Sequence, residues 1–361
     1  MLEKSLIVNR SFLETRIALL ENSQLAKLWI ERDDEKGILG NIYKGTVLRV
    51  LPGMNAAFVD IGLGKSAFLF GGDLLTPEER ESQNLDLEES SAVSNKVEIC
   101  PIQNKLADGQ EVIVQVSKEP LGTKGPRVTT QPTIAGRYVV LMPGNKTVAL
   151  SRRIEDEVEK RRLTNISEKL VENEDYGIIV RTAGQGAPKE SIARDFNLLK
   201  KNWQKIEQKI SASPAPSLVY SELNLIKKTC RDFFDEGLEM ILCDHYNTYL
   251  QLRSFFSENL PEAFKLLKFY DQQTPIFDIF GVEIDIGRAI GKRIDLPSGG
   301  YLIIEQTEAL TSFDVNTGKF VGKANAQQTI LTTNLEATVK VVEQLKIRNL
   351  GGIIVIDFID M

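Results

Sequence analysis

The chain has 361 residues, 42% of them hydrophobic, which is enough for about two to four domains with buried cores. A formal net charge of −6 excludes a uniformly basic nucleic-acid-binding protein, so any contact with a polyanion must come from local clusters of cations. Three widely spaced cysteines and a single histidine argue against a disulfide framework, a zinc site and a mechanism built on paired histidines. The sequence shows neither a signal-peptide pattern nor an apolar run long enough to span a membrane, so a soluble protein of a reducing compartment is expected.

Short β-type segments open the chain and predict a hairpin or meander, at 5–8, 15–20 and 25–30. A second β-rich region begins at Gly40. Its short strands alternate with glycine turns as far as residue 69 and resume at 110–116, which is typical of a small five-stranded OB-type barrel. The intervening residues 76–105 are polar, acidic and rich in serine, as in a solvated insertion loop.

Barrels of this type commonly offer aromatic rings for base stacking and cations for phosphates. Phe58 and Phe68 are the candidates for stacking, although each taken alone is more simply interpreted as a residue of the barrel core. The candidate cations are Lys44, Arg49 and Lys65 among the strands, and Lys118, Lys124 and Arg127 in a glycine-bearing turn that is predicted to follow the barrel.

A change of character follows residue 129, where strands are predicted at 137–143 and 176–180 and helices after Arg153 and at 190–210. Arg181 and Thr182 come directly after the second of these strands, where it opens into a glycine turn. A guanidinium, a hydroxyl and backbone amides at such a turn can hold a phosphate. The alternative is a surface ion pair with a turn cap, and the residues alone leave both interpretations open.

Two lone aspartates stand at the ends of apolar strands near the end of the sequence. Strands are predicted at 301–305, 310–316 and 353–356, with Asp314 in the second and Asp357 directly after the third. Apolar residues at helical spacing predict a helix between the last two strands, at Leu331, Leu335, Val339, Val342 and Leu345.

In a strand–helix–strand unit the carboxyl ends of neighbouring strands share one rim, so Asp314 and Asp357 are predicted to converge. Such a pair suits Mg²⁺, which prefers oxygen ligands, and Asn316 could orient a ligand beside it. The alternative is that both aspartates cap turns, which is the more frequent role of an aspartate after an apolar strand. Glu308 and Asp360 lie nearby and are interpreted as polar rim residues.

Taken together, several motifs resemble the ribonuclease E/G family, endoribonucleases that cut single-stranded RNA in bacteria and some plastids. The resemblance covers essentially residues 1–361, with 76–105 as an insertion. In family order, the motifs are Gly-Asn-Ile-Tyr-Lys-Gly at 40–45, Ala-Ala-Phe-Val-Asp at 56–60, Ser-Arg-Arg-Ile at 151–154, Ile-Val-Arg-Thr-Ala-Gly at 179–184, Leu-Pro-Ser-Gly-Gly at 296–300, Thr-Glu-Ala-Leu-Thr at 307–311, Thr-Asn-Leu-Glu-Ala at 333–337 and the run from Gly-Gly at 351–352 to Met361.

This resemblance implies an α+β multidomain fold. An OB-fold RNA-binding domain at 39–128 and a 5′-sensor domain at 129–224 would be inserted into a ribonuclease-H-like domain, formed by 1–38 and 225–288. A partial deoxyribonuclease-I-like α/β catalytic domain at 289–361 would follow.

The resemblance also assigns roles to residues. Phe58, Phe68 and Lys124 would hold RNA on the barrel, and Arg181 and Thr182, with Val140 from the neighbouring strand, would bind a 5′-monophosphate. Asp314 and Asp357 would ligate Mg²⁺, with Asn316 as the polar residue beside them. The implied activity is Mg-assisted hydrolysis of single-stranded, AU-rich RNA to 5′-phosphate and 3′-hydroxyl products, serving rRNA processing and mRNA decay in the bacterial cytoplasm or the plastid stroma.

Family members continue beyond the second aspartate strand into a Cys-Pro-x-Cys segment that shares zinc between subunits, and into a small C-terminal domain. Neither occurs in residues 1–361, and the Cys-Pro pair at 100–101 is not that motif. An incomplete catalytic domain and a homo-oligomer without the zinc link are therefore expected. The alternative to an active nuclease is a truncated, non-catalytic RNA-binding protein of the same family.

Overall fold

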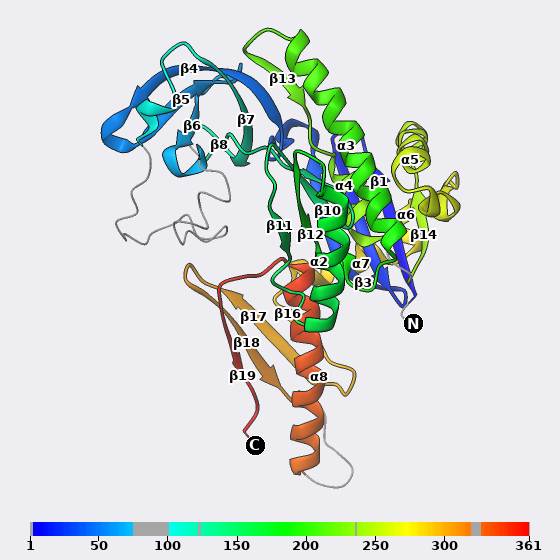
Figure 1. Ribbon diagram of the computed structural model, residues 1–361. Coiled ribbons are helices and arrows are strands. Elements are labelled where there is room, and N and C mark those ends of the chain that lie inside the picture. Colours follow the sequence, from blue (N-terminus) through cyan, green and yellow to red (C-terminus); the bar gives the residue numbers. More distant parts are fainter. Residues whose placement is uncertain (1–2, 75–100, 122–123, 235–236, 319–325, 361) are drawn as a thin grey trace. The chain divides into compact units, whose positions relative to one another are not determined.

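The structure is a computed structural model that describes residues 3–74, 101–121, 124–234, 237–318 and 326–360. The predicted insertion loop at 76–105 therefore lies mostly outside the described residues. The chain divides into two compact units (Figure 1): unit 1 comprises Met1–Glu35 and Leu225–Met361, and unit 2 comprises Lys36–Asn224. Both units contain helices as well as runs of consecutive strands without a helix between them, so the predicted α+β class is confirmed.

A five-stranded sheet in unit 1 combines strands from both segments of that unit, in the order β15-β14-β1-β2-β3. The first three strands form the predicted antiparallel meander, whereas β14 pairs with β1, and β15 with β14, in parallel. Buried side chains such as Ile7 and Leu242 pack against Ile276 and Phe277 of a short helix. The strands are β1 (Lys4–Arg10), β2 (Glu14–Glu21), β3 (Gln24–Arg32), β14 (Leu238–Cys243) and β15 (Leu267–Phe269), and the helices are α4 (Leu225–Phe233), α5 (Tyr246–Asn259), α6 (Ile276–Ile279) and α7 (Val282–Ile290).

Unit 2 contains a closed five-stranded barrel, consistent with the predicted OB-type barrel, because β4 pairs with both β5 and β7. The prediction that Arg127 lies in a turn is wrong, since it begins β8, which pairs with β6 and β7 and completes the ring. Gly45 permits the close approach of β4 and β5, where a Cβ would lie 2.7 Å from the carbonyl oxygen of Asp60. The strands are β4 (Ile42–Leu51), β5 (Ala56–Asp60), β6 (Ala67–Phe70), β7 (Glu111–Lys118) and β8 (Arg127–Thr129), and β13 (Ser217–Tyr220) adds to β4 outside the ring.

A four-stranded sheet follows the barrel in unit 2, in the order β11-β12-β10-β9. Two helices cover one face: Leu163 of α2 and Phe196 of α3 pack on Val139 and Ile178. The helix α3 is amphipathic, and its buried residues recur every three or four positions. The elements are β9 (Ile134–Ala135), β10 (Val139–Pro143), β11 (Val148–Leu150), β12 (Tyr176–Val180), α2 (Glu157–Val171), α3 (Lys189–Ala212) and a short 3₁₀ turn η5 (Thr182–Gly184).

A second four-stranded sheet, in unit 1, has the order β16-β17-β18-β19 (Figure 1). The first three strands are antiparallel, and β18 and β19 are parallel because α8 crosses between them. Phe313 and Val315 point to one face and pack on Ala337 and Val341 of α8, which leaves the other face open. The elements are β16 (Arg293–Asp295), β17 (Tyr301–Gln306), β18 (Leu310–Asn316), α8 (Ala326–Ile347) and β19 (Ile353–Asp357).

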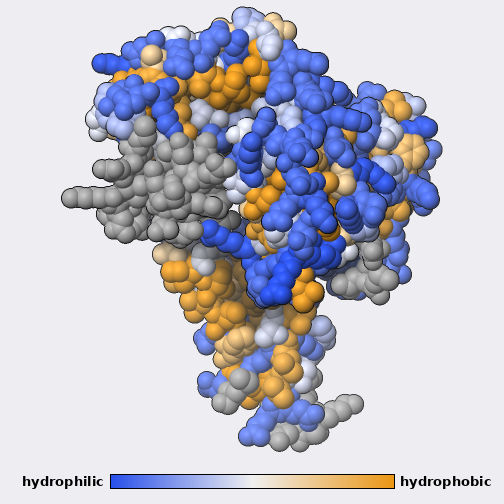
Figure 2. Space-filling model, in the orientation of Figure 1, coloured by the Kyte–Doolittle hydropathy of each residue, from blue (hydrophilic) through white to orange (hydrophobic). Residues whose placement is uncertain are grey.

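The helix α8 is confirmed, but most of the apolar residues that predicted it do not face its sheet. Leu331, Leu335, Val339 and Val342 are exposed, whereas Thr333 and Ala337 are fully buried. Ile353 and Val355 on the open face of β19 are exposed as well. Figure 2 accordingly shows hydrophobic surface over the part of the molecule formed by α8 and its sheet.

No helix within the described ranges is both long enough and apolar enough to cross a membrane.

Candidate functional site

Asp314 and Asp357 are register partners on the adjacent parallel strands β18 and β19. Side chains alternate between the faces of a strand, and Phe313 and Val315 point toward α8, so Asp314 points to the open face. Asp357 is exposed and shares that face because register partners project to the same side. Since neighbouring strands lie about 4.8 Å apart, the two carboxylates are within reach of a single cation.

The amide of Asn316 positions one of these carboxylates. It lies two residues after Asp314, on the same face, and its Nδ2 donates a hydrogen bond of 2.9 Å to Asp314 Oδ2. The sequence therefore places a carboxylate and the donor that orients it on one strand. The resulting site has two carboxylates on a sheet whose other face packs on α8, and an amide that hydrogen-bonds to one of them.

The oxygen-only donor set fits Mg²⁺, which is commonly held by one or two protein carboxylates together with water and substrate phosphates. Among the described residues there is no group of three or more His, Cys, Asp or Glu side chains arranged to hold a metal ion. Glu308 and Asp360 thus do not extend the pair to a third acid. The pair would need ligands from water and from a phosphate, which suits an ion that acts on a phosphodiester.

Polar residues of α8 fix the chain just beyond Asp357. The Asn334 amide donates from Nδ2 to the carbonyl oxygen of Ile359 at 2.9 Å, and its Oδ1 accepts from the Ile359 N–H at 3.1 Å. Two residues further along α8, a Glu336 carboxylate oxygen accepts the N–H of Ser298 at 3.0 Å. These contacts give the Thr-Asn-Leu-Glu-Ala motif a structural role that the sequence analysis did not assign.

Phe58 and Phe68 lie side by side on the outer surface of the barrel. They are register partners on β5 and β6, and their ring centroids are 5.9 Å apart in an edge-to-face arrangement. Their strand neighbours Ala57, Val59 and Leu69 are fully buried in the barrel core, whereas both phenylalanines are only half-buried. The simpler interpretation as core residues is therefore wrong, and both rings are available at the surface.

Two arginines flank the ring pair. Arg49 is the register partner of Phe58 on β4, and Arg127 is that of Phe68 on β8. The Nε of Arg127 also bonds to Asp73 Oδ2 at 2.8 Å, which fixes this guanidinium beside the rings.

Of the four lysine candidates, Lys44 has a structural role, whereas Lys65, Lys118 and Lys124 are exposed. Lys44 Nζ contacts Glu111 Oε2 at 3.0 Å and the carbonyl oxygen of Ser213 at 3.1 Å, so it ties the barrel to the end of α3. Lys124 is exposed, in a turn closed by the bond from its own N–H to the carbonyl oxygen of Leu121. That turn passes so close to another loop that a Cβ on Gly125 would lie 1.9 Å from the Ser66 carbonyl oxygen.

Arg181 and Val140 project from the uncovered face of the β10–β12 pair. Val140 is the register partner of Ile179, and Arg181 follows two residues later, so their side chains share a face. Arg181 Nη1 donates to the carbonyl oxygen of Gly136 at 2.6 Å, which holds the guanidinium against the turn before β10. Thr182 begins the η5 turn beside it and is exposed.

Two acids from the helices that cover this sheet hold the turns next to Arg181 and Thr182. Asp195 of α3 accepts the N–H groups of Tyr138 and Val139 at 2.7 and 3.1 Å, which fixes the turn that Arg181 contacts. Glu159 of α2 accepts the Gly186 N–H at 2.8 Å, just after η5. Hydrogen bonds from Arg162 lower the pKa of Glu159 to about 2, assisted by Gly186 and opposed by burial. The sequence analysis missed both acids, although the Glu159–Arg162 spacing is a visible helical pair.

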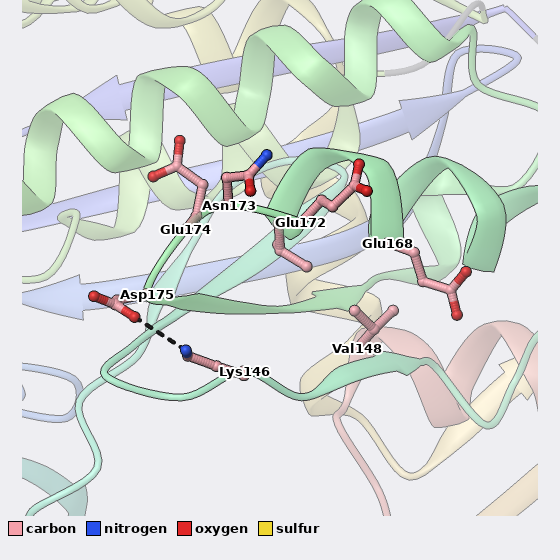
Figure 3. A pocket seen from close by; sticks show the side chains of 8 residues that line it. Lys146, Val148, Glu168, Glu172, Asn173, Glu174 and Asp175 are labelled. Carbon is pink, nitrogen blue, oxygen red and sulfur yellow. Dashed lines mark ion pairs between the residues drawn. The ribbon is translucent and has the colours of Figure 1, made fainter.

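A hollow of about 730 Å³ lies at the opposite end of β12 (Figure 3). Five residues of strand separate it from Arg181, which is roughly 17 Å. Its rim carries four acids, and its one lysine, Lys146, already pairs with Asp175 at 3.4 Å. Its electrostatics therefore disfavour a phosphate. The lining residues are Lys146, Val148, Glu168, Val171, Glu172, Asn173, Glu174 and Asp175.

Comparison with known proteins identifies the family of the chain. A sequence model of the Ribonuclease E/G family matches residues 133–361. Ribonuclease G of Haemophilus influenzae is 46% identical over 99% of this chain and 71% of its own length, and Ribonuclease G of Escherichia coli is 45% identical over the same shares. Ribonuclease E of Nostoc sp. is 37% identical over 96% of this chain and 50% of its own length. The chain therefore belongs to the ribonuclease E/G family.

Proposed function

We propose that this chain is a metal-dependent endoribonuclease that hydrolyses phosphodiesters in single-stranded RNA. The observation that carries the proposal is the register pairing of Asp314 with Asp357 on an open sheet face. Relatives that match nearly the whole chain are named ribonucleases, which supports the same reaction class. An open face is also what an extended RNA strand requires to reach two adjacent carboxylates.

The two aspartates would hold Mg²⁺, which when bound acidifies an attacking water and offsets the negative charge that develops at phosphorus. Asn316 keeps the Asp314 carboxylate in one orientation through its hydrogen bond. The contacts of β18 and β19 with α8 pack both strands on one core, which supports the register that sets the spacing of the carboxylates. Hydrolysis by in-line attack would leave 5′-phosphate and 3′-hydroxyl ends.

Substrate preference would follow from unit 2. Bases must be unpaired to stack on Phe58 and Phe68, so these rings favour single-stranded RNA, including AU-rich regions that pair weakly. Lys124 would contact the backbone nearby. Capture of a 5′-monophosphate by Arg181 and Thr182, with Val140 packing beside it, would favour RNA that has lost its triphosphate. The enzyme would thereby serve RNA processing and decay.

The domain assignments belong to the same proposal. The sheet shared by the two segments of unit 1 would be the ribonuclease-H-like domain, and the barrel would be the OB-fold. The α2–α3 sheet would be the 5′-sensor domain, and the β16–β19 sheet with α8 would be the deoxyribonuclease-I-like catalytic domain.

The test is cleavage of a 5′-monophosphorylated, single-stranded RNA in the presence of Mg²⁺. Asp314→Asn and Asp357→Asn should each lower the rate at least about 100-fold, because several kcal/mol of charge stabilisation depend on the ion they hold. Asp278→Asn, an exposed aspartate on α6, is the matched control and should cut normally. Wild-type rates in both site variants would rule out the proposed metal centre.

RNA binding without cleavage is the second candidate. It is favoured by the position of the Phe58–Phe68 pair in unit 2, whereas both aspartates lie in unit 1. It predicts that Phe58→Ala with Phe68→Ala abolishes binding while Mg²⁺ produces no cutting by the wild-type chain. Sustained turnover by the wild-type chain would exclude this candidate.

A further inference from the structure

Arg293 lies in the same cross-strand row as the two aspartates. Arg293 on β16 is the register partner of Ile303 on β17. Ile303 is in turn paired with Asp314 on β18, and Asp314 with Asp357 on β19. Register partners project to the same face of a sheet, so Arg293 shares the open face with both carboxylates. Two strand spacings, roughly 10 Å, separate the Cα atoms of Arg293 and Asp314.

The guanidinium of Arg293 is held in place by its neighbours on that face. Its central carbon lies 3.9 Å from the centroid of the Tyr301 ring, and its Nε donates to Asp295 Oδ1 at 2.9 Å. Asp295 and Tyr301 are themselves register partners in the next row, which leads on to Asn316. Stacking on one face and a hydrogen bond at Nε together fix the plane of the group, so little orientational freedom remains to be lost on binding.

The outer end of the same guanidinium is available to a ligand. Its two terminal amino groups make no hydrogen bond with any of the described residues, and the side chain is 57% exposed. By contrast, the ammonium group of the neighbouring Lys292 donates a hydrogen bond to Glu305 Oε1 at 3.1 Å. A pair of parallel N–H groups at the end of a fixed guanidinium matches two oxygens of a phosphate.

The electrostatics of the face require such a cation. Asp295, Glu305, Asp314 and Asp357 all lie on it, and within the described part of the chain only the first two are paired, with Arg293 and Lys292, so the face keeps a net negative charge that repels an approaching polyanion. A metal ion would offset only the charge around the aspartate pair. RNA lying across the strands therefore needs a second positive group away from that pair, and Arg293 stands at the far end of the row.

We propose that Arg293 binds an RNA phosphate next to the one being cleaved, and thereby sets the path of the strand across the sheet. The inference rests on the proposed ribonuclease function. Its ligand is a backbone phosphodiester, so the contact carries no base preference. Arg293 would act in substrate binding, and Asp295 and Tyr301 would act as positioning residues for it.

The sharpest test is a thermodynamic cycle that combines a substitution of Arg293 with the neutralisation of one RNA phosphate at a time. Binding of a fluorescent single-stranded RNA is measured in EDTA, with neutral methylphosphonates placed one at a time around the cleavage position. Arg293→Ala should weaken binding of unmodified RNA about 10- to 100-fold, the range for a charge-assisted contact. One methylphosphonate should weaken wild-type binding similarly and add no further loss in the variant, because the two changes remove the same interaction.

Arg288→Ala is the matched control, since Arg288 is 71% exposed, pairs with Asp285 and lies on α7 rather than on this sheet. Arg293→Lys keeps the charge but not the fork, so its affinity should fall between wild type and Arg293→Ala. Thermal melting shows whether each variant is folded. If Arg293→Ala melts early, the folded Arg293→Lys protein must show the same phosphate-specific loss in smaller degree.

The outcomes separate this inference from the function it rests on. If the wild-type chain cuts RNA and Arg293→Ala binds and cuts like Arg288→Ala, the inference fails while the ribonuclease stands. If every methylphosphonate weakens the Arg293→Ala variant as much as wild type, the phosphate contact is likewise refuted. A wild-type chain that neither binds nor cuts RNA refutes both.

Discussion

A single amide orients one of the two carboxylates in the candidate metal centre. Asn316 lies on the same face as Asp314 only because it follows at an even interval on β18, and its hydrogen bond leaves the second carboxylate oxygen of Asp314 for another ligand. At this scale the predicted convergence is confirmed, since both aspartates and the asparagine share one face, whereas their role as ligands stays a prediction. It could not distinguish a ligand from a turn cap, because that depends on which strand lies alongside.

Loss of the Asn316 amide should weaken the metal centre without destroying it. In Asn316→Ala the Asp314 carboxylate is free to rotate, so we expect the Mg²⁺ concentration for half-maximal cleavage to rise about 10-fold or more. Ser312→Ala, two residues before Asp314 on the same face of β18, is the control and should leave the Mg²⁺ requirement unchanged. An unaltered Mg²⁺ titration for Asn316→Ala would remove the orienting role of the amide.

The surface phenylalanines should affect RNA binding more than stability. Phe58→Ala removes a stacking surface worth about 1–3 kcal/mol per base, so affinity for single-stranded RNA should fall about 10-fold or more, and affinity for a duplex should not. Leu69→Ala, one residue beyond Phe68 but fully buried, should instead lower the free energy of unfolding by about 2–5 kcal/mol. The paired measurements are fluorescence anisotropy and chemical denaturation, and equal losses for single-stranded and duplex RNA would contradict stacking.

At the scale of elements, α8 shows what a hydrophobic pattern leaves undetermined. The spacing of Leu331, Leu335 and Val339 predicted a helix correctly, but the buried face carries Thr333 and Asn334 instead. These polar residues are buried because they hydrogen-bond to backbone, as Asn334 does to Ile359. Periodicity indicates which side chains share a face, whereas the inner face is also set by the packing of Ala337 and Val341 on the sheet and by the bonds of Asn334 to Ile359, which no local window contains.

The α2 helix offers a pH-dependent prediction through Glu159. Its pKa in the folded chain is about 2, lowered from the ordinary 4.5 chiefly by the Arg162 hydrogen bonds. A lowered carboxyl pKa stabilises the fold fully above the unfolded value and progressively less as the pH falls through the folded one. The Glu159 contribution should therefore be complete above about pH 4.5 and disappear toward pH 2.

Glu159→Gln should lower the free energy of unfolding by about 1 kcal/mol at pH 7 and flatten this pH dependence. Glu157→Gln, on the same helix, breaks only the more exposed pair with Lys160 and should change stability by less than about 0.5 kcal/mol. Denaturation midpoints at pH 7, 4 and 2.5 provide the measurement. Parallel pH curves for wild type and Glu159→Gln would contradict the assignment.

At the scale of the whole molecule, the two units differ in how the chain builds them. Unit 2 is continuous from Lys36 to Asn224 and has its own cores in the barrel and beneath α2 and α3. Unit 1 is assembled from two segments, because β1 pairs with β14 across more than 200 residues of sequence. Local patterns predicted most strands of both units, but such a long-range pairing was implied only by the resemblance to a family.

Unit 2 alone should bind RNA without cutting it. A fragment of residues 36–224 retains the ring pair and Arg181 but neither aspartate, so we expect a cooperative thermal transition, binding of single-stranded RNA and no Mg²⁺-dependent cleavage. The same fragment with Phe58→Ala and Phe68→Ala is the control and should fold without binding. Failure of a folded 36–224 fragment to bind would place the main RNA contacts elsewhere.

The pairing of Asp314 with Asp357 also imposes a counting rule on the loop between α8 and β19. One residue inserted at Gly351 or Gly352 would shift β19 by one position. Ile356 would then stand opposite Asp314, and the Asp357 side chain would point to the sheet face that packs on α8. Two inserted residues would restore the correct face but move the second carboxylate one row along. The length of that loop is thus constrained in both parity and number, and its composition is constrained at Gly352, whose φ of +87° favours glycine.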